Sequence, residues 1–173
     1  MNDRKLFSTN VLIENFIKQL DQVEVLDGGW TILYIDKTSG KEWIKYIFDD
    51  RSLSHNLLQI KPRLSTDDLI DIALNSTYPD EVIAAANRLY YEDKQDNNQY
   101  RARLIEKLLE RIQSKLEPSE KERITSIIQA GNLLSDLNRR EITGKHYTEV
   151  YKDANYFKNI AFQAAEILAQ LKA

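Results

Sequence analysis

The sequence predicts an α+β fold that is mainly α-helical, with a small antiparallel β-hairpin or sheet near the N-terminus followed by antiparallel helix hairpins. Aromatic and β-branched residues, typical of strands, are concentrated between Trp30 and Phe48, and apolar residues recur at helical spacing from residue 64 to the end. Only five glycines and three prolines interrupt 173 residues. We therefore expect a helix and hairpin in residues 1–63 and a helical subdomain in residues 64–173, packed together as one compact domain.

A short amphipathic helix is expected first, between Ser8 and Leu20. Either Ser8 or Thr9 can cap its N-terminus, and Leu12, Phe16 and Leu20 recur every four residues. This spacing places the three apolar side chains on one side of the helix.

Two strand-like runs follow, WTILYIDK at residues 30–37 and EWIKYIF at residues 42–48. The intervening Thr38-Ser39-Gly40 is typical of a bulged hairpin turn, with Gly40 in the left-handed position. If Lys37 pairs with Lys41, one face of the ribbon combines the apolar side chains of Trp30, Ile32, Tyr34, Ile44, Tyr46 and Phe48.

That face is expected to pack in the core, whereas Trp43 lies on the other face and is available for packing or binding. An isolated two-stranded ribbon is marginal in water. We therefore expect helices on one face, and either a third strand at Leu57–Ile60 or a partner to complete the sheet.

Helices are expected from residue 64 onward. Ser65 and Asp68 form a capping-box pattern, and Pro79 suits the first turn of a second helix. Three longer apolar patterns follow, over residues 101–116, 118–137 and 147–171.

The composition narrows the class of function. The chain has no cysteine, a net charge of −3 and a pI near 5.5. These values disfavour disulfide scaffolds, cysteine metal sites and nucleic-acid binding, which needs an excess of basic residues. No apolar run has the length of a membrane span, so we expect no membrane partner and a cytoplasmic protein. The charge balance leads us to expect no nucleic-acid partner either. The oligomeric state is left open.

Catalytic patterns are sparse. The phosphate-binding glycine motifs and the nucleophile elbow are missing from the sequence, and His55 and His146 stand apart from any metal-ligand spacing. We expect no enzyme activity, no cofactor and no metal. The enzymatic alternative is a hydrolase that uses the carboxylates of Asp49, Asp50 and Glu42, with His55 as base.

The hairpin resembles small immunity proteins of bacterial polymorphic-toxin systems. Its segment Gly29-Trp30, Leu33-Tyr34-x-Asp36, Gly40 and Trp43 matches their Gly-Trp strand, turn glycine and second tryptophan. Ser52 and His55 stand where those proteins show Ser-x-x-His, although Asn56-Leu57-Leu58 replaces their following glycine run. The resemblance covers residues 28–64, about a fifth of the chain.

This resemblance implies a protein that binds and blocks a cognate toxin domain. It fits the scarcity of catalytic patterns and the nine tyrosines and two tryptophans, which are residue types favoured at interfaces. The expected contact residues are Trp43, Asp49, Asp50 and His55. The main alternative is a helical adaptor in another complex.

Overall fold

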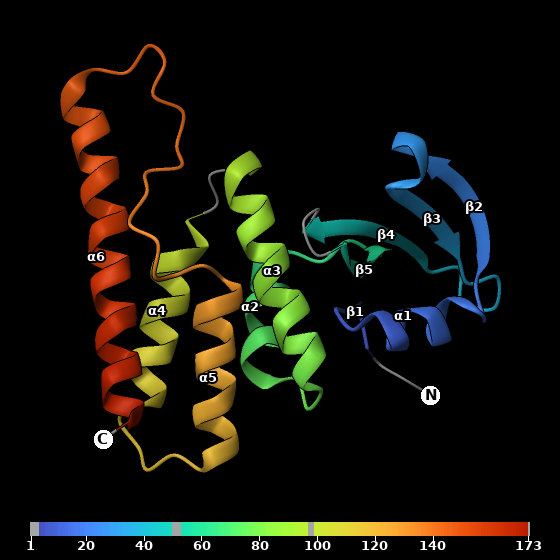
Figure 1. Cartoon of the computed structure of the whole chain (residues 1–173), viewed down its shortest axis with the longest axis horizontal. Coiled ribbons are helices and arrows are strands. Elements are labelled where there is room, and N and C mark those ends of the chain that lie inside the picture. Colours follow the sequence, from blue (N-terminus) through green and yellow to red (C-terminus); the bar gives the residue numbers. More distant parts are fainter. Residues whose placement is uncertain (1–3, 50–52, 97–98, 173) are drawn as a thin grey trace. The chain divides into compact units, whose positions relative to one another are not determined.

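The computed structural model describes residues 4–49, 53–96 and 99–172, and within them the chain has the expected α+β fold, with a five-stranded antiparallel sheet and six α-helices (Figure 1). It divides into two compact units, residues 1–87 and 88–173, each described here by itself. The sheet ends at Lys61, two residues before the boundary expected at residue 63, whereas the two units divide within a helix. No helix of the described residues is long and apolar enough to cross a membrane.

The sheet has the strand order β1-β5-β4-β3-β2, and its bounds are Leu6–Phe7 (β1), Asp21–Leu26 (β2), Thr31–Ile35 (β3), Glu42–Asp49 (β4) and Ser54–Lys61 (β5). The expected third strand is confirmed as β5. Strands β1 and β2 were not predicted. The first is only two residues long, and the second carries two acidic side chains among its six residues.

The predicted hairpin register is wrong by one residue. Tyr34 lies opposite Trp43, and Leu33 lies opposite Ile44. The cause is Asp36, whose carboxylate accepts a hydrogen bond from the Thr38 N–H at 2.9 Å and one from the Ser39 hydroxyl at 2.5 Å. This Asx-type turn places residues 37–40 in the loop and leaves Asp36 to pair with Lys41.

A slip of one residue exchanges the two faces of a strand, so Trp43 joins the buried face that carries Ile32 and Tyr34. Trp30 is not part of β3, because it ends the turn before that strand with helical backbone angles. Trp43 is only 2% exposed, whereas Trp30 is 50% exposed. Helix α1 (Asn10–Ile17) covers the Trp43 face, where the Phe16 ring meets the indole edge-on with centroids 4.8 Å apart. The remaining core residues around it are Phe7, Ile13, Tyr34 and Leu57.

Helices α2 (Thr66–Asn75) and α3 (Pro79–Asp96) follow the sheet, and the capping box of Ser65 and Asp68 is present as predicted. The first turn of α3 holds β1 in place. The buried Glu81 carboxylate accepts hydrogen bonds from the backbone N–H groups of Lys5 and Leu6, at 2.6 and 3.2 Å. This clamp satisfies backbone donors on the short edge strand that would otherwise be buried without partners.

The second unit contains helices α4 (Tyr100–Arg111), α5 (Pro118–Ala130) and α6 (Tyr147–Lys172). The fifth helix ends seven residues before the predicted Leu137, because Gly131 caps it. Tyr100 and Arg101, both fully buried, donate hydrogen bonds to the Gly131 and Asn132 carbonyls at 2.5 and 2.8 Å. These bonds neutralise the negative end of α5.

The different burial of Trp43 and Trp30 predicts different losses of stability when each side chain is truncated. Trp43→Ala should lower the free energy of unfolding by about 3 to 5 kcal/mol, because it leaves a cavity against Phe16 and Phe7. Trp30→Ala should cost about 1 kcal/mol or less, since half of that side chain is already in water. Urea denaturation of both variants measures the difference. Equal costs, or a larger cost at Trp30, would contradict the burial of Trp43 and the exposure of Trp30.

Candidate functional site

Strand β2 forms an open edge of the sheet. It pairs with β3 on one side, and no strand of the described residues pairs with its other side (Figure 1). Val23 and Val25 are 62% and 50% exposed, and the β2–β3 register shifts between Gln22 and Glu24. An exposed edge offers unpaired backbone donors and acceptors to another chain.

Trp30 extends this edge at the turn between β2 and β3. The turn is the 3-10 segment η1 (Asp27–Gly29), in which Gly28 and Gly29 adopt the positive φ angles of 66° and 101° that favour glycine. The Trp30 carbonyl accepts a hydrogen bond from the Ile47 N–H at 3.3 Å, which anchors the backbone to β4. The backbone is therefore anchored while the indole stays half exposed.

Acidic residues accompany these apolar groups. Asp21, Glu24 and Asp27 lie on β2 or directly after it, and only Asp21 has a basic partner in the described chain, with Lys37 at 3.0 Å. Both members of that pair are more than half exposed, so it contributes little to stability. We call the set Asp21, Val23, Glu24, Val25, Asp27 and Trp30 the β2 edge surface. It combines apolar anchors with an acidic rim.

The residues expected to contact a partner are not brought together. Trp43 is in the core, and this expectation is corrected by the register described above. His55 is half-buried on β5, and its backbone N–H donates a hydrogen bond to the Asn10 Oδ1 at 3.3 Å. Asp49 is the last residue of β4 and its side chain is outside the described part of the structure, as is the whole of Asp50.

The set proposed for a hydrolase is also separated. Glu42 begins β4 and forms an ion pair with Lys61 at 2.9 Å, whereas Asp49 ends the same strand. Seven residues of extended strand span roughly 20 Å. His55 pairs with Ile47, near the Asp49 end. Glu42 therefore cannot share a reaction centre with His55 and Asp49.

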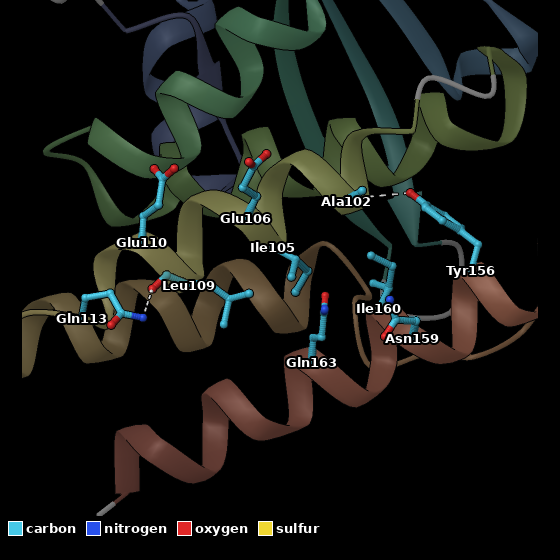
Figure 2. Close-up of a pocket in the computed structure, with 10 residues that line it drawn as sticks. All are labelled: Ala102, Ile105, Glu106, Leu109, Glu110, Gln113, Tyr156, Asn159, Ile160 and Gln163. Atoms are coloured by element: carbon cyan, nitrogen blue, oxygen red, sulfur yellow. Dashed lines mark hydrogen bonds between the residues drawn. The ribbon is translucent and has the colours of Figure 1, made fainter.

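The second unit has a groove of about 620 Å³ between α4 and α6 (Figure 2). Its apolar lining is Ile105, Leu109 and Ile160, and the carboxylates of Glu106 and Glu110 point away from α6 in Figure 2. Burial raises the pKa of Tyr156, whose hydroxyl accepts the Ala102 N–H at 3.3 Å. This groove brings no acid and base into contact. In the part of the chain that the structure describes, no three His, Asp or Glu residues cluster as metal ligands do.

The fold and the exposed edge together define an α+β protein with a sheet open to pairing on one side. Comparison of the chain with protein-family models, curated proteins and solved structures gives no match. The functional argument therefore depends on the chemistry of the β2 edge surface itself.

The environment of His55 predicts a pH dependence of stability. Burial, and secondarily the Lys45 cation, hold the pKa of His55 below its ordinary value of 6.5. As the pH falls below 6.5, the unfolded chain takes up a proton that the folded protein resists, so the free energy of unfolding decreases. Above that pH both states hold a neutral imidazole, and the contribution vanishes.

His55→Gln should therefore flatten the dependence of stability on pH between about 7.5 and 5.5, measured by urea denaturation. His146→Gln, at an exposed position before α6, is the matched control and should keep the wild-type slope. A wild-type slope in the His55 variant would refute the burial argument.

Proposed function

We propose that this protein binds another protein through the β2 edge surface and acts as an immunity protein that blocks a cognate toxin domain. The observation that carries the proposal is the unpaired β2 strand, with Val23, Val25 and Trp30 at least half exposed beside it. Single exposed apolar residues are ordinary, but three on one free strand and its adjoining turn are typical of an interaction surface.

Strand addition is the mode of binding that this geometry favours. An extended segment of the toxin adds its backbone hydrogen bonds to β2, and the two valines and the indole supply apolar contacts that select its side chains. Tryptophan is the residue type most enriched among those that dominate binding energy. The bound toxin is then blocked by steric occlusion of its active site.

The acidic rim favours a basic partner. Glu24 and Asp27 have no basic partner among the described residues, so their negative charges can attract basic side chains of an approaching protein. Opposite charge mainly accelerates association and sets register, while desolvated apolar groups slow dissociation. Toxin domains that attack nucleic acids carry such basic surfaces, because they must bind phosphates.

The immunity assignment rests on the resemblance over residues 28–64. That segment contains Trp30 and the strands β3, β4 and β5 that support the free edge. Neutralisation needs no cofactor and takes place in the cytoplasm of the toxin-producing cell. It requires an affinity in the nanomolar range or tighter and an interface of about 1,200 to 2,000 Å².

A helical adaptor is the second candidate, and a different surface favours it. Three aromatic side chains on α6, Tyr147, Tyr151 and Phe162, are 75%, 66% and 61% exposed. Successive helical residues turn by 100°, so positions 147, 151 and 162 lie within about 60° of one another on the helix surface. This stripe could dock a partner helix independently of β2.

Co-expression with the toxin domain encoded beside this gene tests the proposal. Wild-type protein and Val11→Asp should protect the cells, because Val11 is an exposed valine on α1, outside the β2 edge surface. Val25→Asp and Trp30→Ala should fail to protect, with Trp30→Ala weakening toxin binding by about 2 kcal/mol or more. Circular dichroism verifies that all variants fold.

The outcomes separate the alternatives. Death of cells that contain abundant folded wild-type protein would overturn the immunity role. Protection by both edge variants would overturn the β2 edge surface while retaining immunity. Loss of binding only on Tyr151→Asp would assign the interface to α6.

A further inference from the structure

The geometry points to a binding site for a small phosphate monoester in the second unit, formed by Arg139 and the loop that follows α5. A cavity of about 460 Å³ is lined by Tyr90, Asn132, Ser135, Leu137, Asn138 and Arg139. Its volume is within the range of small-molecule pockets. This inference does not depend on the proposed function, because it uses none of the residues of the β2 edge surface.

Arg139 is the charged group of the cavity. Its guanidinium carbon lies 4.2 Å from the centroid of the Tyr90 ring, and its Nη1 is buried without a hydrogen-bond partner. No carboxylate of the described residues forms an ion pair with it. A buried cationic donor without an acceptor is costly, and a bound oxyanion would offset that cost.

The other cations of this region, unlike Arg139, have carboxylate partners. The Arg101 Nε lies 3.1 Å from Asp93, and Arg140 and Lys145 both bind Asp153. Both aspartates are therefore engaged by other cations, and neither forms an ion pair with Arg139.

Negative groups near the cavity do not oppose an anion. The C-terminal carbonyls of α5 at Gly131 and Asn132 already accept hydrogen bonds from Tyr100 and Arg101. The loop that follows α5 carries two acidic residues, Asp136 and Glu141, and both are exposed and absent from the cavity lining. Water screens their charges.

The lining matches the two parts of a phosphate monoester. A planar guanidinium can donate two parallel hydrogen bonds to phosphate oxygens, and the Ser135 hydroxyl and the amides of Asn132 and Asn138 are further donors. Tyr90 and Leu137 offer apolar surface to the organic group of the ester. A single unpaired arginine suits one phosphate and not a nucleic-acid backbone, which requires many cations.

Titration of the full chain with inorganic phosphate and with phenyl phosphate, at constant ionic strength, tests the site. Amide chemical shifts should move saturably around residues 132–139, and phenyl phosphate should bind more tightly than inorganic phosphate. Arg139→Gln should weaken both affinities by about tenfold or more, since hydrogen bonds to charged groups are the strong ones. Arg139→Lys keeps the charge but loses the planar donor pair, and should be intermediate.

Lys115→Gln is the control, because it removes one positive charge at an exposed position of the same unit, away from the cavity. It should bind both compounds as the wild type does. Three results would overturn the site: no saturable shift, equal weakening by Arg139→Gln and Lys115→Gln, or inorganic phosphate binding as tightly as its phenyl ester. The thermal transition of each variant verifies that it is folded.

Discussion

The pairing of β3 with β4 is the constraint on which the first unit depends. A strand has only two faces, so a displacement of one residue would move Trp43 away from the face that carries Tyr34 and out of the core beneath α1. Two local interactions prevent this. Asp36 accepts hydrogen bonds from the turn, which sets the loop length, and Trp43 packs against Phe16 and Phe7 beneath α1. Turn chemistry and aromatic packing thus select the same register.

The exposed surface of the first unit depends on the turn before β3, where Trp30 ends η1 and is not part of the strand. With Trp43 and Tyr34 buried under α1, the other tryptophan is left beside the free β2 strand. The β1 end of the sheet is held by the Glu81 carboxylate, which binds its backbone donors. Among the described residues, the open side of the sheet is therefore β2, where acidic residues reduce non-specific pairing with other strands.

Arginine chemistry distinguishes the second unit. Arg101 is fully buried, yet it is stabilised by Asp93, by the Asn132 carbonyl and by the neighbouring rings of Tyr100 and Phe157. It joins the end of α5 to α4 and orients the loop that follows. Arg139 on that loop stacks on Tyr90 but has no carboxylate partner among the described residues. One arginine is thus structural, and the other is available to a ligand.

The sequence by itself determined the fold class, the helices, β5 and the capping box, because these follow from spacing and short-range chemistry that each segment carries alone. It did not reveal β1, which is a strand only because β5 and Glu81 pair with its backbone. The alternating pattern of β2 was a weak signal, since acidic side chains lower strand propensity. Trp43 was expected on an exposed face and is buried, because register depends on a single residue of loop length. Only the tertiary structure, through the Asp36 turn and the packing of α1, placed Trp43 in the core, and the turn before β3 left Trp30 exposed.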